Sequence, residues 1–287
     1  MLRYGVELPV GAVCADPRVL AEFAAAAERA GWDGVFLEDY IVYGTQPDCP
    51  TCDPWIALAA MALATERVRL GTTVTAPSRR RPWKLARETV TLDHLSGGRL
   101  VLGVGLGDPT DAGFSHVSEE TDDRARARRL DESLEILAGL WSGERFSFTG
   151  AHYEVRDVRF LPTPIQSPGV PVWVGGGFNR PAVLRRAVRQ SGIVPYKPSR
   201  ADPYRDADEG LSAAEVAGIR DFVECERGSA DGFDTVIGGR RRGPDWDAER
   251  RHIRSIADAG ATWWGEWVPP GPLEEMRRAV EAGPLTV

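Results

Sequence analysis

Short, nearly continuous apolar runs alternate along the chain with longer stretches in which apolar residues recur every three or four positions. The first pattern is typical of strands covered on both faces, and the second of amphipathic helices. The clearest unit comprises a β-branched run at 68–75, a helical pattern at 82–94 and a second apolar run at 99–107. Gly97 and Gly98 follow the helical pattern, where a left-handed helix end favours glycine. Two buried strands joined by a helix are predicted to be parallel.

The same alternation extends over the whole chain. Strands are predicted at 4–8, 34–38, 68–75, 99–107, 170–174, 192–196, 233–237 and 261–267. Helices are predicted at 17–30, 55–64, 82–94, 124–141, 181–190, 213–224, 245–259 and 272–282, and a hairpin at 146–158 stands outside the alternation. Eight strands, each followed by a helix, predict an α/β fold of the (β/α)8 TIM-barrel class, with one domain over residues 1–287. Two doubly wound domains are the alternative, which no change of composition near the midpoint supports.

Composition narrows the classes of function. Apolar residues make up 43% of the 287 positions, enough for a large core, and the formal net charge of −7 argues against a nucleic-acid surface. No stretch approaches the length of a membrane span, and the first residues lead directly into a strand. Neither a membrane partner nor a signal peptide is therefore expected. The four cysteines suit a reduced, cytoplasmic protein better than a disulfide scaffold.

In a barrel of this class the active site lies in the loops that follow the strands. The segments that this rule selects are 38–40, 72–75, 103–108, 175–179, 195–197, 238–239 and 264–267. The second and third of these are rich in small residues, which leaves room for a flat ligand to approach the backbone. The predicted floor of the binding site consists of Thr72, Thr73, Val74, Gly105 and Gly107.

These segments resemble a known family. The residues that carry the resemblance are Leu70-Gly71-Thr72, Val74-Thr75, Leu85-Ala86-Arg87-Glu88, Leu92-Asp93, Leu95-Ser96-Gly97-Gly98-Arg99 and Leu102-Gly103-Val104-Gly105, with 30–36 near the start of the chain and 171–176 in the middle. They closely resemble the bacterial-luciferase-like superfamily, whose members use FMN or the deazaflavin F420. The resemblance implies a cofactor ring on the predicted floor. It also implies a homodimer through the helices after the second and third strands, with Trp55, Met61 and Trp83 in its face.

The resemblance further implies a place for the cofactor phosphate. The run Gly175-Gly176-Gly177 lies between a predicted strand and a helix start, where exposed amides and Arg180 favour an anion. Tyr196 and Lys197, at the end of the next strand, would lie nearby. A tight turn is the alternative interpretation of the glycine run. Neither a Gly-x-Gly-x-x-Gly unit with its acidic partner nor a Walker motif is present, so a Rossmann or P-loop site is not expected.

Two carboxylates are candidates for catalysis. Asp39 follows a buried strand and could bond a cofactor ring edge or act as a base if its pKa is raised, with a loop cap as the alternative. Many relatives have histidine at the next position, where this chain has Tyr40, and a phenol is a poor base near neutral pH. This departure slightly favours a flavin-type monooxygenase, and so FMN over F420. Glu266 shares one face of the last strand with Trp264, and its place near the strand end makes it a candidate for substrate contact.

The predicted function is that of a luciferase-like oxidoreductase that uses reduced FMN or F420 for monooxygenation or hydride transfer on a small organic substrate. A barrel that binds a flavin without catalysis, or serves a structural role, is the alternative. Loops 41–52, 108–120 and 198–211 are expected to form the substrate pocket. No metal site is predicted, because Cys49 and Cys52 have no second pair of ligands and the four histidines do not cluster.

Overall fold

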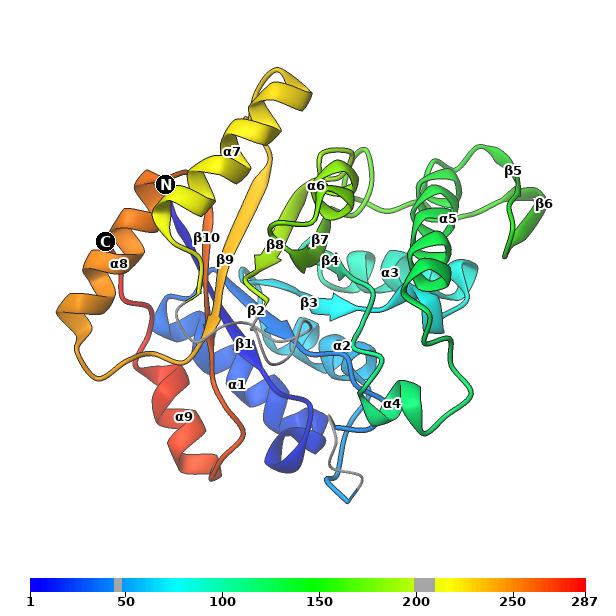
Figure 1. Ribbon diagram of the computed structural model, residues 1–287. Helices are drawn as coiled ribbons and strands as arrows, with labels where there is room; N and C mark the ends of the chain where they lie inside the picture. Colours follow the sequence, from blue (N-terminus) through cyan, green and yellow to red (C-terminus); the bar gives the residue numbers. More distant parts are fainter. Residues whose placement is uncertain (44–47, 199–209) are drawn as a thin grey trace.

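The computed structural model describes residues 1–43, 48–198 and 210–287. Within these residues, eight parallel strands close a barrel in the order β1-β10-β9-β8-β7-β4-β3-β2 (Figure 1). The strands are β1 (Arg3–Leu8), β2 (Gly34–Leu37), β3 (Arg69–Thr75), β4 (Leu100–Val104), β7 (Val172–Gly177), β8 (Gly192–Tyr196), β9 (Asp234–Arg240) and β10 (Trp263–Trp267). Because β1 pairs with both β2 and β10, the first strand lies beside the last, and the predicted (β/α)8 barrel is confirmed.

Helices surround the barrel on its outer face (Figure 1). The longer helices are α1 (Pro17–Ala30), α2 (Pro54–Ala64), α3 (Pro82–Leu95), α5 (Asp123–Trp141), α6 (Pro181–Ala187), α7 (Ala213–Arg227), α8 (Trp246–Asp258) and α9 (Leu273–Glu281). Short helical turns are η1 (Ala12–Ala15), η2 (Pro77–Arg79) and α4 (Ala112–Ser115). Aspartate caps begin α1 and α2: the Asp16 side chain accepts from the Arg18 amide, and the Asp53 side chain from the Trp55 and Ile56 amides.

Several boundaries differ from the prediction. β7 continues to Gly177 and β9 to Arg240, so Gly175-Gly176-Gly177 and Gly238-Gly239 lie within strands rather than in the loops after them. β4 ends at Val104, so the glycines that follow it belong to a loop, and α6 ends at Ala187 rather than near 190. The polar loop after β4 contains the four-residue helix α4, which was not predicted. The hairpin is present as β5 (Arg145–Thr149) and β6 (Glu154–Arg159), which pair with each other outside the barrel.

A layer of large side chains fills the barrel interior. Its members are Phe36, Val101, Trp173, Val236 and Trp263, all nearly fully buried. Aromatic rings cross it, with ring centroids 5.2 Å apart for Phe36 and Trp173 and 5.4 Å apart for Trp173 and Trp263. We call this set the aromatic layer. It fills the interior below the carboxyl ends of the strands, so the space above it opens toward that end.

Side chains alternate along a strand, so the inward position next above the aromatic layer lies two residues later. On β4, β7, β9 and β10 this position is a glycine: Gly103, Gly175, Gly238 and Gly265. After β2 it is Glu38. The barrel is therefore wide just above the aromatic layer, with two carboxylic acids, Glu7 from β1 and Glu38, reaching into the space.

Candidate functional site

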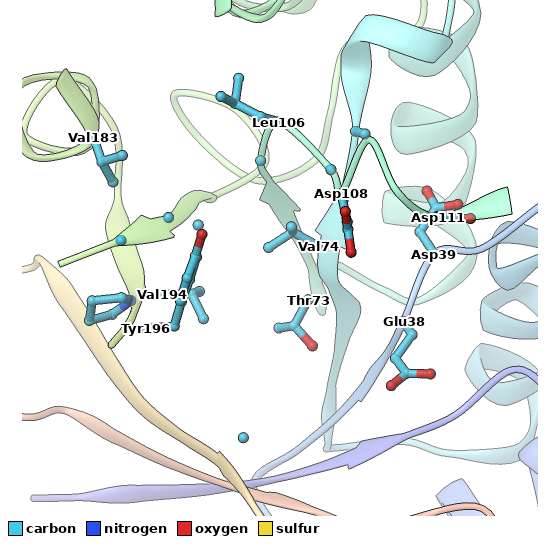
Figure 2. A pocket seen from close by; sticks show the side chains of 18 of the residues that line it. Glu38, Asp39, Thr73, Val74, Leu106, Asp108, Asp111, Val183, Val194 and Tyr196 are labelled. Carbon is cyan, nitrogen blue, oxygen red and sulfur yellow. The ribbon is translucent and has the colours of Figure 1, made fainter. Parts of the chain in front are cut away.

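A cavity of about 340 Å³ opens at the carboxyl ends of the strands, above the aromatic layer (Figure 2). It is lined from β1, β3, β7, β8 and β9, from the segments after β2 and β4, and from α6. This is the position that the barrel topology predicts for an active site. Of the loops expected to form the substrate pocket, 41–52 and 198–211 lie partly outside the described residues, and parts of 108–120 line the cavity.

Val74 forms a raised point on the cavity floor. The pairing of β3 with β4 shifts register between Thr72 and Thr75, and the Thr73–Val74 peptide is cis. The Val74 side chain projects into the cavity (Figure 2) and lies against two glycines. A Cβ atom on Gly105 would lie 2.7 Å from Val74 Cγ2, and one on Gly175 would lie 2.9 Å from Val74 Cγ1. The floor therefore keeps its shape only because both positions lack a side chain.

Most residues predicted to contact the cofactor ring lie on the cavity wall. Thr73, Val74, Gly105 and Gly107 line it. Thr72 does not: its fully buried hydroxyl donates to the Gly103 carbonyl over 3.2 Å, behind the wall. The alternation of side chains explains this, because Thr72 points away from the interior when Thr73 points toward it.

Of the residues predicted to hold the phosphate, some line the cavity and one does not. The run Gly175-Gly176-Gly177 lines the cavity together with Tyr196, but Lys197 is not part of the lining. The Lys197 ammonium instead forms an ion pair with Glu215, 3.2 Å from its Oε1. Arg180, at the start of α6, lines the cavity and is exposed to solvent. It forms no ion pair or hydrogen bond through its side chain within the part of the chain that the structure describes.

Asp39 lies at the cavity but its carboxylate is already engaged. Arg80 Nη2 lies 2.9 Å from both carboxylate oxygens, and Arg79 Nη2 lies 3.3 Å from Oδ1. The Thr75 hydroxyl also donates to Oδ2 over 2.7 Å. With an exposed side-chain fraction of 1%, this carboxylate joins β2 to the segment after β3. These contacts favour a positioning role, and a direct catalytic role for Asp39 stays a prediction.

Glu266 lies away from the cavity. It accepts from Arg242 Nε over 3.0 Å and from Nη2 over 2.9 Å, and it does not contribute to the cavity lining. Burial raises the pKa of its carboxyl, and the Arg242 guanidinium opposes that rise. The alternation of β10 is the reason, because Trp263 belongs to the aromatic layer and Glu266 lies on the opposite face. A substrate contact by Glu266, expected from the sequence, is not supported by this placement.

Glu38 belongs to the selected segment 38–40, but it was not among the residues predicted to be catalytic. It lines the cavity, and its Oε2 atom is buried without a hydrogen-bond partner among the described residues. Burial raises the pKa of its carboxyl to about 7, against hydrogen bonds from the Tyr43 hydroxyl and the Trp267 indole that lower it. The signal for it was in the sequence: Glu38 comes two positions after Phe36, on the inward side of the strand.

Within residues 1–43, 48–198 and 210–287, no group of three or more His, Cys, Asp or Glu side chains is placed to hold a metal ion. All four cysteines are free, including Cys49 and Cys52. Among the described helices, none combines the length and the apolar character needed to cross a membrane.

Comparisons of the sequence with known proteins match one family over most of the chain. The family model of luciferase-like monooxygenases matches residues 3–221. An F420-dependent glucose-6-phosphate dehydrogenase from Microbacterium testaceum is 34% identical over 211 residues, which cover 69% of this chain and 60% of that protein. The enzyme of the same name from Nakamurella multipartita is 32% identical over 232 residues, covering 77% of this chain and 62% of that protein. This chain thus matches less than two thirds of the length of either relative.

Solved structures share the fold over nearly the whole chain. Monooxygenase RslO1 from Streptomyces bottropensis superposes with a TM-score of 0.77 at 21% identity, covering 98% of this chain and 97% of that one. An F420-dependent secondary alcohol dehydrogenase, in complex with an F420–acetone adduct, superposes with a TM-score of 0.77 at 15% identity, covering 98% of this chain and 96% of that one. At such identities the likeness concerns the fold alone.

Proposed function

Because this chain belongs to the luciferase-like monooxygenase family, we propose that it is an oxidoreductase that binds deazaflavin F420 at the barrel mouth and exchanges a hydride with a small organic alcohol. The observation that carries the proposal is the similarity to F420-dependent glucose-6-phosphate dehydrogenases, at 34% identity in the Microbacterium protein. The presence of Tyr40 where many relatives have histidine slightly favoured FMN as the predicted cofactor. These relatives support F420 instead, and FMN remains the second cofactor to test.

The cavity fits a flat tricyclic ring with a phosphate-bearing tail. Gly105 and Gly175 leave space on both sides of the Val74 side chain, against which the ring would lie, and the buried Thr73 hydroxyl has no partner among the described residues. Gly177 and Arg180 would hold the phosphate. When bound, the deazaflavin supplies the hydride acceptor or donor. The protein positions the ring, and the aromatic layer keeps water out from below.

We further propose that the substrate is uncharged and carries no phosphate. The cavity wall presents the carboxyl groups of Glu7, Glu38, Asp108 and Asp111. Of the arginines in the lining, Arg180 is assigned here to the cofactor phosphate and Arg186 is paired with Asp131. Arg79 lies among the carboxyl groups, but its guanidinium is shared between Asp39 at 3.3 Å and Asp111 at 3.6 Å. A phosphate placed against this wall would meet like charges at short range, which is costly in a partly desolvated site. The substrate of this chain would then differ from that of its named relatives.

A homodimer and a cytoplasmic location are also part of the proposal. Trp55 and Met61 are buried within the chain, so they cannot form the expected dimer face. Ile56 and Leu63 on α2, with exposed fractions of 65% and 75%, and the half-exposed Trp83 on α3 are available for that role. Large exposed apolar side chains on neighbouring helices are typical of an interface. The four free cysteines suit a reducing compartment.

The test is a fluorescence titration of the purified protein with F420 and with FMN. F420 should bind the more tightly, and reduction of bound F420 should then follow addition of glucose or a small secondary alcohol but not of glucose 6-phosphate. Incorporation of one atom of molecular oxygen into an organic substrate by the complex with reduced FMN would instead identify a monooxygenase. If neither cofactor binds to the folded protein, the proposal fails.

A further inference from the structure

We propose that Glu38 is the catalytic acid–base residue of this cavity, the group that accepts the hydroxyl proton of the substrate and returns it in the reverse reaction. The inference rests on the proposed function. It also explains how a chain with Tyr40 in place of the histidine of many relatives could handle a proton.

Geometry is the first argument. Phe36 points into the aromatic layer, so Glu38 points into the space directly above it. Figure 2 shows Glu38 on the same side of the cavity as Thr73, below Asp39 and Asp108. Its Oε2 atom is buried and has no hydrogen-bond partner among the described residues. A buried carboxylate oxygen is costly to leave unpaired, so an oxygen kept in this condition beside a cavity is suited to a ligand hydroxyl.

The groups that face Glu38 keep it able to exchange a proton. Tyr43, from the segment after β2, and Trp267, from the end of β10, each donate a hydrogen bond to its carboxyl. The Cys14 thiol of η1 lies close enough to interact electrostatically. Glu7 of β1 lines the same cavity and adds negative charge, and Thr73 of β3 adds a hydroxyl. No ion pair to Glu38 occurs within the described parts of the chain.

Burial dominates over these donors and brings the pKa of the carboxyl to about 7. At neutral pH the group is then present in both protonation states, which suits a residue that must give and accept the same proton. Asp39 is unsuited to this task, because Arg79, Arg80 and Thr75 already donate to its oxygens. Tyr40 also lines the cavity, but a phenol remains protonated near neutral pH.

The proton step balances with the redox step. In alcohol oxidation the O–H bond breaks and its proton bonds to Glu38 Oε2. The electron pair of that bond becomes part of the new C=O bond. The carbon loses its hydrogen with two electrons to the deazaflavin, which is thereby reduced. In carbonyl reduction each transfer runs backward, and protonated Glu38 delivers the proton to the carbonyl oxygen.

The first experiment measures the carboxyl itself, without cofactor. Protein labelled with ¹³C at the glutamate carboxyls is titrated by NMR, with Glu38→Gln to assign the resonance. One resonance with a midpoint near pH 7, absent in Glu38→Gln, supports the inference. A Glu38 midpoint near the ordinary glutamate value overturns it, whether or not a cofactor binds. If the midpoint is near 7 and neither F420 nor FMN binds, the proposed function fails and the catalytic role of Glu38 fails with it, while the raised pKa of its carboxyl stands.

The second experiment measures hydride transfer in a single turnover of the F420 complex with the alcohol that reduces it. Glu38→Gln should bind F420 within about twofold of wild type and slow the transfer by roughly 100-fold or more, the usual contribution of a positioned acid or base. Glu38→Ala should regain part of the rate when acetate is added. Glu135→Gln, on the exposed face of α5, is the control. Unchanged rate and pH profile in folded Glu38→Gln would overturn the inference.

Discussion

A buried acid at the barrel mouth should lower the stability of the fold at the pH where it works. The pKa of Glu38 rises from 4.5 to about 7 on folding, so between these values the folded protein holds a proton that the unfolded chain releases. Stability therefore falls as pH rises through this range and is constant above it. At 1.36 kcal/mol per pKa unit the full loss is about 3 kcal/mol. About 2.5 kcal/mol of this loss in the free energy of unfolding occurs between pH 5 and pH 8.

Glu38→Gln removes the titration and keeps the size of the side chain. The difference in free energy of unfolding between Glu38→Gln and wild type is therefore expected to depend on pH. From pH 5 to pH 8 it should shift by about 2.5 kcal/mol in favour of the variant, whatever its value at pH 5. The assay is urea unfolding followed by tryptophan fluorescence at both pH values. Glu135→Gln, an exposed substitution on α5, should show no such change. Parallel pH dependence of wild type and Glu38→Gln would refute the assignment of a raised pKa to Glu38.

Three further predictions concern other parts of the site and its surroundings. Arg180→Ala should weaken F420 binding by about three- to tenfold in titrations, because an exposed charge-assisted contact is lost, whereas Arg185→Ala on the same helix, off the cavity, should not. Leu63→Glu should convert a dimer to a folded monomer in sedimentation analysis, because it places a charge on a side chain that is 75% exposed in the single chain. Gly238→Ala should lower the thermal midpoint by several degrees, because its φ of +145° disfavours other residues and its Cβ would lie 2.0 Å from the Gly265 carbonyl oxygen.

The barrel itself was predictable because its signals are local. Apolar runs at strand length and helical spacing after each run depend on neighbouring residues only, and they were enough to order the eight strands along the chain. The ends of helices and strands were predicted less accurately, especially in polar segments. The short helix α4, for example, begins at an Asp111 cap inside a loop that carries no apolar repeat.

The chemistry of the mouth was harder to predict because it depends on contacts between distant residues. Sequence analysis selected Asp39 rather than Glu38 as catalytic, since both follow the same strand and only the inward direction of Phe36 separates them. The engagement of Asp39 depends on Arg79 and Arg80, about forty positions later. Lys197 was predicted to be near a phosphate, and its pairing with Glu215 arises from a helix that packs close only in the folded chain. Periodicity does not report which charges neutralise one another.

The contact of Val74 with two glycines has a consequence for how this protein can change. Gly105 and Gly175 come from different strand ends, yet each leaves room for the same side chain, on opposite methyl groups. A methyl group gained at either position is therefore expected to be tolerated only after one is lost at Val74, so that the order of substitutions matters. Gly105→Ala should be harmful in the natural background and nearly neutral beside Val74→Ala, a dependence that a double-mutant cycle on thermal stability would measure. Homologous sequences should accordingly covary at these positions, and a redesign of the floor for a differently shaped ring must alter them together.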